Sequence, residues 1–324
     1  MSNKVLKPKK ASLYQFTQKY SNNIDNCIEF FKSMKWPEGF SCDRCGCHKY
    51  YLVKRVGKTK ISYVLECSSC HKQHSLLSGT IFQSCKLDLY KLLLGIFLFF
   101  NENKGISAVD LCSILDVNYK TALLLENKCR ILMSLSNSDK LLNSLFYEAD
   151  VFNIGAKSKN KAGRASGQQP ILGILSTDKE NNYPRFIKLR VITDYTGLSL
   201  KKNIEKCCVL SHDALLNTDG EKGFNTLNEE IQVKNEKISY EEKDHRLLWL
   251  NIIIGNIKNN ITGIYHGITK REMPLFLNEQ EYRFNHRKMG KTIMDKIKKY
   301  LQRSFPISHR QIVYILNISA PHFS

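Results

Sequence analysis

Two Cys-x-x-Cys pairs constrain the fold of this chain more than any other feature. They are Cys42/Cys45 and Cys67/Cys70, and 21 residues separate them. Two pairs at this distance are typical of a structural Zn²⁺ held by four thiolates in a tetrahedron, with each pair supplied by one tight turn. Residues 50–53 and 61–65 are largely apolar and aromatic and flank Gly57, so we expect two strands joined by a turn. The sequence therefore predicts a zinc ribbon over residues 37–84.

The remaining cysteines indicate the redox environment. Of the 11 cysteines, seven lie outside the two pairs, and an odd, scattered set fits a reducing compartment better than a disulfide framework. Cys47 and His48 are spare ligand types beside the first pair, but we do not expect either to bind the metal. The seven are Cys27, Cys47, Cys85, Cys112, Cys129, Cys207 and Cys208.

The chain carries a large excess of positive charge, +19 in total, with a sequence pI near 9.4. Such an excess favours a polyanion, and DNA or RNA is the expected partner. An AT-rich genome, which would also explain the abundant Asn, Ile and Lys, is an alternative origin for part of it. Residues 1–10 lack the apolar core of a signal peptide, and the apolar run at 92–100 is too short to span a bilayer. We therefore expect a soluble intracellular protein without membrane contact.

Residues 86–136 are expected to be helical and to contain a helix-turn-helix. Residues 107–115 form one amphipathic stretch, and Ser107 is a plausible cap. A three-residue turn and a longer helix from residue 119 follow, which is the pattern of a DNA-binding helix-turn-helix. An ordinary helical hairpin has the same pattern. In the DNA-binding interpretation, the first residues of the second helix enter a groove: Tyr119, Lys120 and Thr121.

The region after residue 145 predicts an α/β fold. Strands are expected at residues 145–152, 170–177, 183–193 and 214–218, and a helix at 199–206 before the fourth strand. Three strands, a helix, a fourth strand and then further helices is the order of an RNase H-like fold. The polar stretch at residues 136–140 is the best candidate boundary before it.

Two aspartates have positions suited to catalysis. Asp150 lies inside the first predicted strand and Asp219 at the end of the fourth, and these strands are neighbours in an RNase H-like layout. Paired carboxylates can hold two Mg²⁺ roughly 3.5–4 Å apart for phosphoryl transfer. A single Asp is more often a solvated turn or a helix cap. Asp150 is nevertheless flanked by apolar side chains, where an unpaired acid is costly to bury.

The helix expected at residues 247–262 offers a third ligand. Asn251 and Lys258 are seven residues apart, so they share a face about 10 Å apart. The amide oxygen could bind a metal and the ammonium could hold a phosphate. Asn256 competes for the ligand role, but roughly 200° of helix rotation separates it from Lys258. Glu242 and Asp244, just upstream, are carboxylate alternatives.

A series of motifs resembles one family of bacterial insertion-sequence transposases. This is the fifteen-ninety-five (ISXO-like) family, related to the eukaryotic Merlin transposases, and the resemblance spans about residues 28–290. The motifs, beside the four cysteines, are Trp36-Pro-Glu-Gly-Phe40, Gln73-His-Ser-Leu-Leu-Ser-Gly-Thr-Ile-Phe82, Lys104-Gly-Ile-Ser-Ala108, Tyr119-Lys-Thr-Ala122, Thr218-Asp219-Gly220, Gly263-Ile-Tyr-His-Gly267 and Arg283-Phe-Asn-His-Arg287.

The resemblance implies an RNase H-like nuclease with an acid–acid–X–lysine signature. X is Glu, Asn or His, and the lysine follows seven positions later, so the set here is Asp150, Asp219, Asn251 and Lys258. The implied protein binds the terminal inverted repeats of its element as double-stranded DNA and uses Mg²⁺, or Mn²⁺ in its place, to cut them and join them to target DNA. Two ends must be paired, so a homodimer or higher synaptic assembly is expected. The expected location is the cytoplasm, in association with the nucleoid, in a bacterium, or the nucleus in a eukaryote.

This chain departs from the family at two places. Family members often carry Glu directly after the first catalytic Asp, where this chain has Val151, and Gly-Gly-Lys is replaced by Gly155-Ala156-Lys157. A neutral third ligand also binds metal less tightly than a carboxylate. The alternatives are therefore a catalytically silent, transposase-derived DNA-binding protein, or a zinc-ribbon transcription factor whose two aspartates lie far apart.

The expected organisation has five parts. A basic arm and a helix (residues 1–36) precede the zinc ribbon (37–84) and the helix-turn-helix region (86–136). The catalytic domain follows at 145–290, and a basic helical tail at 291–324.

Overall fold

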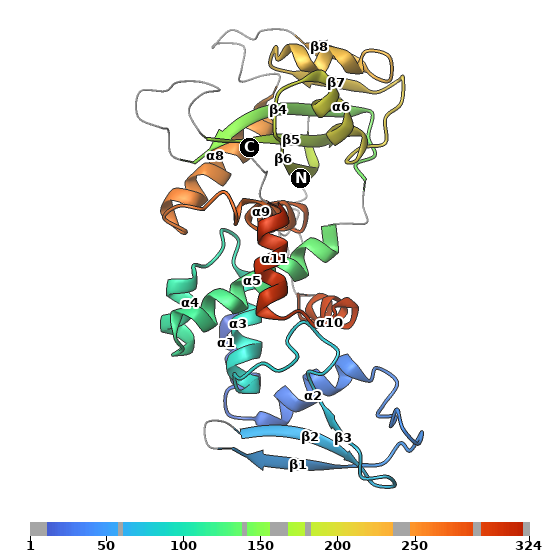
Figure 1. The fold of residues 1–324 in the computed structure, drawn as a ribbon, viewed down its shortest axis with the longest axis vertical. Coiled ribbons are helices and arrows are strands. Elements are labelled where there is room, and N and C mark those ends of the chain that lie inside the picture. Colours follow the sequence, from blue (N-terminus) through green and yellow to red (C-terminus); the bar gives the residue numbers. More distant parts are fainter. Residues whose placement is uncertain are drawn as a thin grey trace, which may run out of the picture. The chain divides into compact units, whose positions relative to one another are not determined.

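A computed structural model describes residues 12–57, 61–137, 141–155, 168–178, 183–235, 247–287 and 293–319 (Figure 1). The chain divides into two compact units. The N-terminal unit comprises residues 1–135 and 287–312, and the central unit comprises residues 136–286 and 313–324. In these described ranges, no helix is both long and apolar enough to cross a membrane.

The N-terminal unit joins a small sheet to a group of helices. Helix α1 lies where a basic arm was expected, and the Ser12 hydroxyl caps it by accepting from the Gln15 amide at 3.4 Å. The elements in chain order are α1 (Leu13–Tyr20), α2 (Ile24–Lys35), β1 (Tyr50–Val56), β2 (Ile61–Cys67), β3 (Gln73–Ser75), α3 (Leu89–Asn101), α4 (Ala108–Leu115), α5 (Tyr119–Asn137) and α10 (Ile293–Arg303). The last helix, α11 (His309–Ser319), is divided between the two units.

The sheet of the N-terminal unit has the order β1-β2-β3 and is antiparallel throughout. The two strands predicted between the cysteine pairs are confirmed, and each is longer than expected. The third strand was not predicted; its register pairs Leu65 with His74. Leu65 is fully buried at the centre of this sheet.

Helix α10, close to the C-terminus, packs within the N-terminal unit. Its buried residues, Ile293, Ile297, Tyr300 and Leu301, follow helical spacing and form one apolar face. This face lies on α2 and α3. The Gln302 amide donates to the Met34 carbonyl at 2.9 Å, and the Ile81 amide donates to the Ser304 hydroxyl at 3.1 Å. The segment that we described as a tail therefore completes the packing of the N-terminal unit.

The two helices of the predicted helix-turn-helix are present. Ser107 caps α4: its hydroxyl accepts from the Asp110 amide at 3.1 Å and donates to the Asp110 carboxylate at 2.7 Å. Asp116 ends α4 in a left-handed conformation with φ 49°. The Asn118 side chain then accepts from the Thr121 amide at 2.9 Å, so α5 begins with a cap after three intervening residues.

The central unit is a mixed α/β domain built on a five-stranded sheet. The sheet has the order β6-β5-β4-β7-β8, in which β4, β5 and β6 are antiparallel neighbours and β7 and β8 run parallel to β4. Strand β8 was not predicted. The elements are β4 (Phe146–Ile154), β5 (Gln169–Asp178), β6 (Tyr183–Val191), α6 (Gly197–Glu205), β7 (Leu215–Thr218), the 3₁₀ helix η2 (Lys222–Leu227), β8 (Gln232–Asn235), α8 (Leu248–Gly263) and α9 (Met273–Asn285).

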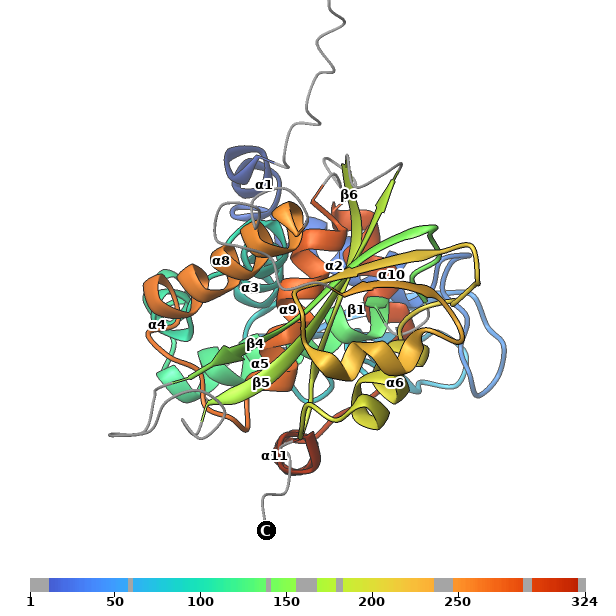
Figure 2. The ribbon, with the colours of Figure 1, turned by 90° about the horizontal axis from the view of Figure 1, so that it is seen from above.

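Both faces of this sheet are covered. Side chains of α6 and η2 pack on one face, where they meet Tyr147 and Ala149 of β4. Side chains of α8 and α9 pack on the other face, where they meet Phe152 and Ile154. Figure 2 shows α6 and α8 on opposite sides of the strands. Alternate residues of β4 therefore point to different helical layers.

Helix α9 closes the β6 edge of the sheet. The Ile187 amide donates to Asn285 Oδ1 at 2.8 Å, and Asn285 Nδ2 donates to the Ile187 carbonyl at 3.0 Å. Glu281 Oε2 accepts from the Leu189 amide at 3.2 Å and pairs with Arg190 at 3.1 Å. The side chains of α9 thus satisfy backbone groups that a further strand would otherwise pair.

Candidate functional site

The four predicted zinc thiols come together in the N-terminal unit. Their Sγ atoms all lie within 4.8 Å of one another, and the pairs Cys42–Cys70 and Cys45–Cys67 are each 3.5 Å apart. Four sulfurs around a zinc ion at 2.3 Å would be about 3.8 Å apart. The four thiols therefore fit a tetrahedral zinc ion.

The two turns that carry these cysteines have the same backbone design. In each, the amide of the fifth residue donates to the carbonyl of the first cysteine: Gly46 to Cys42 at 2.8 Å, and His71 to Cys67 at 3.1 Å. Gly46 and His71 are both left-handed, with φ of 71° and 57°. Burial raises the pKa of the Cys42 thiol, but hydrogen bonds from the Arg44 and Cys45 amides lower it to about 6. Amides directed at this sulfur favour the thiolate that a zinc ion needs.

The spare ligand types beside the first pair have other partners. Cys47 Sγ lies 3.5 Å from the Ser68 hydroxyl, and His48 Nδ1 lies 3.0 Å from the Phe40 carbonyl oxygen. Neither belongs to the cluster of four. His74, which the sequence analysis did not single out as a ligand, is buried and lies near Cys42 and Asp43 in a second group of possible ligands.

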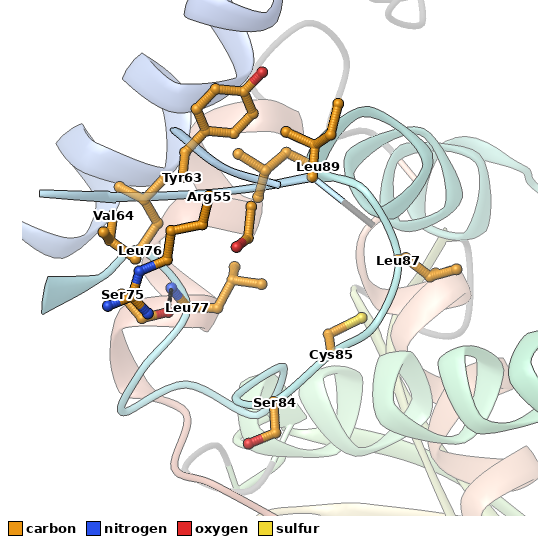
Figure 3. A pocket seen from close by; sticks show the side chains of 12 residues that line it. Arg55, Tyr63, Val64, Ser75, Leu76, Leu77, Ser84, Cys85, Leu87 and Leu89 are labelled. Atoms are coloured by element: carbon orange, nitrogen blue, oxygen red, sulfur yellow. Dashed lines mark hydrogen bonds between the residues drawn. The ribbon is translucent and has the colours of Figure 1, made fainter. Parts of the chain in front are cut away.

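A separate hollow of about 190 Å³ lies in the same unit (Figure 3). Apolar side chains line most of it, and Arg55 and three serines add polar groups. Figure 3 shows Arg55 beside Ser75 at one end of the hollow, with Cys85 and Leu87 at the other. None of the four zinc thiols lines it, so it is distinct from the metal site.

In the central unit, strand register aligns the two predicted catalytic aspartates. The parallel pairing of β4 with β7 matches Phe146 with Leu215 and Glu148 with Asn217. Two residues further along each chain are Asp150, inside β4, and Asp219, directly after β7. Extending this register by two residues puts Asp150 and Asp219 at the same level on adjacent strands, which lie about 4.8 Å apart. Gly220, with φ 95°, turns the chain away immediately after Asp219.

Asp150 is on the α8 face of the sheet. It pairs directly with Gly173 of β5, and a Cβ built on Gly173 would meet Leu250 of α8 and Phe152 of β4, each at 3.3 Å. Directly opposite residues of an antiparallel pair point to the same face. Glu148, Asp150 and Phe152 alternate along β4 and therefore share this face. The glycine opposite Asp150 allows α8 to approach closely.

Helix α8 carries Asn251 and Lys258 on its exposed flank. Lys258 Nζ lies 5.8 Å from the centre of the Phe152 ring, two residues along β4 from Asp150. On the opposite flank, the Asn260 amide donates to Gln280 of α9 at 2.9 Å. Nine residues, or roughly two and a half helical turns, separate Asn251 from Asn260, so Asn251 faces away from α9.

The sheet order shows which strands lie beside the flank of α8 that carries Asn251 and Lys258. Helix α8 packs on β4 and β5, and α9 packs on β6 at the sheet edge. The flank of α8 that faces away from α9 is therefore on the side of β4 and β7, which carry the aspartates. Asn256, only four residues before Asn260, is on the α9 flank. Glu242 and Asp244, the carboxylate alternatives, lie outside the described residues.

One acidic residue near the aspartates was missed from the sequence. Glu148 is fully buried on the same face of β4 as Asp150, and its Oε2 accepts from the Leu250 amide at 2.9 Å. Burial raises the pKa of its carboxyl to about 7, against the lowering effect of the Leu250 amide. Within the described part of the chain, its Oε1 is buried without a hydrogen-bond partner. An acid between Tyr147 and Ala149 in an apolar strand was a usable signal.

The residues predicted to enter a DNA groove begin helix α5. Tyr119 is 51% exposed and Lys120 is exposed, and Thr121 is half-buried in the first turn. An exposed aromatic ring and an ammonium group at a helix start can contact bases and phosphates.

Comparisons with known protein families match two regions of the chain. Residues 23–73 match the transposase zinc-ribbon domain, and residues 146–285 match the ISXO2-like transposase domain. These two matches confirm the resemblance to this transposase family that the sequence motifs indicated. The first contains the four thiols, and the second contains Asp150, Asp219, Asn251 and Lys258. No curated protein matches the chain at a significant level.

Proposed function

We propose that this protein, which carries both domains of these insertion-sequence transposases, is a DNA transposase. It would bind the terminal inverted repeats of its element, cleave the DNA strands there and transfer them to target DNA. The observation that supports the proposal is the parallel register of β4 and β7, whose last pair, Glu148 with Asn217, lies two residues before Asp150 and Asp219. Helix α8, which bears Asn251 and Lys258, packs on β4. Matches to two transposase domains in the order expected also support the proposal.

The topology of the central unit supports an RNase H-like fold. Three antiparallel strands are followed by a helix and by two strands parallel to the first, in the order β6-β5-β4-β7-β8. The first and fourth strands of the unit are neighbours, as that fold requires. This arrangement disfavours the zinc-ribbon transcription factor, which needed the two aspartates far apart.

In the proposed site, three oxygen donors would hold Mg²⁺: the carboxylates of Asp150 and Asp219 and the amide oxygen of Asn251. These are the hard oxygen ligands that Mg²⁺ prefers. Bound Mg²⁺ would lower the pKa of the attacking hydroxyl and stabilise the leaving oxygen. Lys258 would hold a backbone phosphate beside the cut, because it is an exposed cationic residue on the same flank of α8 as Asn251.

DNA binding is assigned to the N-terminal unit. The zinc ribbon and the helix pair α4/α5 would bind the element ends, with Tyr119, Lys120 and Thr121 at the groove. The net charge of +19 would add salt-sensitive, sequence-independent affinity. Because two ends must be paired before strand transfer, the active form would be a dimer or a larger synaptic assembly.

The test is a strand-cleavage assay on DNA that carries the inverted repeats flanking the reading frame. We expect cuts at the repeat boundary with Mg²⁺ or Mn²⁺, and none when Asp150 is replaced by Asn. Val151 and the neutral Asn251 favour one rival, a silent transposase-derived DNA-binding protein. Tight binding to the repeats without cleavage in either metal would establish that rival, and a lack of binding would contradict both.

A further inference from the structure

The first turn of α8 is held by a side chain from the sheet. Its N-cap residue, Leu247, provides no side-chain hydrogen bond. The early amides of a helix lack partners within the helix itself. Here the Leu250 amide, in the first turn, donates to Oε2 of the buried Glu148 at 2.9 Å. Glu148 thus takes the role that an N-cap side chain usually has, although it lies 102 residues before Leu250 in the sequence.

This hydrogen bond joins two parts of the proposed cleavage site. On the strand side, Glu148 lies two residues before Asp150 on the same face of β4. On the helix side, Leu250 directly precedes Asn251, and Leu250 is itself fully buried against the sheet. A carboxylate also favours a helix N-terminus electrostatically. The bond therefore fixes the spacing between the strand that carries one proposed ligand and the turn that carries another.

We propose that Glu148 is a positioning residue: by accepting from the Leu250 amide it holds the first turn of α8, and with it Asn251, in register with Asp150. This inference rests on the proposed function. Asn251 is exposed, and the N-cap residue of its helix makes no side-chain hydrogen bond. The bond from Leu250 to Glu148 would therefore hold the backbone of this turn in place, and with it the position of the Asn251 amide oxygen.

The buried second oxygen of Glu148 supports more than a packing role. In the described residues Oε1 has no hydrogen-bond partner, which is a net cost for a buried polar atom. An apolar side chain of the same size would avoid that cost but would leave the Leu250 amide without an acceptor. The acid therefore does what an apolar residue could not do here: it supplies an acceptor for the Leu250 amide.

The experiment compares three variants of the full-length protein. Glu148→Leu removes the acceptor, and Glu148→Gln keeps an oxygen at the same distance. Gln169→Leu is the matched control: Gln169 is also fully buried, on the neighbouring strand β5, with its side-chain NH₂ hydrogen-bonded to the Pro170 and Ile192 carbonyls and its side-chain oxygen unpartnered in the described residues. The readouts are the cleavage rate at saturating Mg²⁺, the Mg²⁺ concentration for half-maximal rate, and hydrogen exchange over residues 247–256.

We expect Glu148→Leu to raise the half-maximal Mg²⁺ concentration by about 10–100-fold, the usual cost of losing a group that orients a metal ligand. Its first turn of α8 should exchange faster. Glu148→Gln should restore both readouts to near the wild-type values, and Gln169→Leu should change neither. If Glu148→Leu does not fold, Glu148→Asp serves instead, because the shorter side chain withdraws its oxygen from the Leu250 amide.

Two outcomes would overturn the proposal. Unchanged Mg²⁺ dependence and exchange in Glu148→Leu would show that the hydrogen bond positions nothing. Equal loss in Glu148→Gln and Glu148→Leu would show that the charge itself acts at the metal. If the wild-type protein does not cleave at all, the proposed function fails separately, and the exchange of the α8 amides still decides whether Glu148 anchors the helix.

Discussion

The thiol cluster and the proposed aspartate site are built in opposite ways. All four thiols come from residues 42–70, in two turns of the same backbone design joined by one hairpin. The residues of the proposed cleavage site come from three elements separated by more than a hundred residues: Asp150 from β4, Asp219 from the end of β7, and Asn251 and Lys258 from α8. The first site is local and the second depends on the whole fold of its unit. Each should therefore fail in a different way when it is damaged.

The largest expected effect is the loss of zinc. Structural zinc contributes on the order of 10–16 kcal/mol of apparent binding free energy in small modules, so Cys42→Ser should unfold the ribbon. Metal analysis should show the loss of one zinc per chain, and the fluorescence of Trp36, which packs against Phe40 and His74, should change. Cys47→Ser is the matched control and should keep its zinc. Retention of zinc by Cys42→Ser would make the assignment wrong.

Next in size is the loss of an aspartate from the proposed cleavage site. Metal stabilisation of a phosphoryl transition state amounts to several kcal/mol, so Asp150→Asn should lower the cleavage rate by at least about 10³-fold. Affinity for the repeats should not fall, because binding is assigned to the other unit. Asp178→Asn, which removes an acid paired with Arg185 on the same sheet, should cleave normally. A normal rate in Asp150→Asn would place the chemistry elsewhere.

A smaller effect separates the two asparagines of α8. Asn251→Ala should lower the cleavage rate at limiting Mg²⁺ by at least about tenfold, because a metal ligand is lost. Asn256→Ala should change it little, since that residue is on the α9 flank of the helix. The measurement is the cleavage rate across a Mg²⁺ titration. The reverse ranking would show that the α9 flank forms the site.

The smallest effect concerns the helix pair. Ser107→Ala removes the cap of α4 and should lower the free energy of unfolding of the N-terminal unit by about 1 kcal/mol. Ser113→Ala, an exposed position on the same helix, should have almost no effect. The chain has two tryptophans, one in each unit, so denaturation in a Trp249→Phe background reports on Trp36 alone. Equal values for the two serine variants would contradict the capping role.

The sequence predicted local features well. Spacing alone identified the four thiols, and Ser107 and the three-residue turn identified the two helices of the pair. Non-local features were harder. Strand β8 was missed because Gln-Val-Lys-Asn has too short an alternation to indicate a strand, and it forms only by pairing with β7. The amphipathic pattern of α10 predicts that it packs, but no pattern says against which helices.

The aspartates and Glu148 show the same limit. A resemblance and a strand order indicated that Asp150 and Asp219 belong together, and their common level depends on a register that only pairing sets. Glu148 passed unnoticed although the argument made for Asp150, an acid in an apolar strand, applied to it equally. Its meaning lies in a contact with α8, which no local pattern encodes.

The closure of the β6 edge by α9 has a consequence for how two copies can be joined. Asn285 and Glu281 already occupy backbone groups of Ile187 and Leu189, so a strand from another molecule cannot add to the sheet there. If two copies pair at this edge, helix side chains must form that contact. Such an interface could be weakened or strengthened one residue at a time, leaving the sheet, and the aspartates aligned on it, undisturbed.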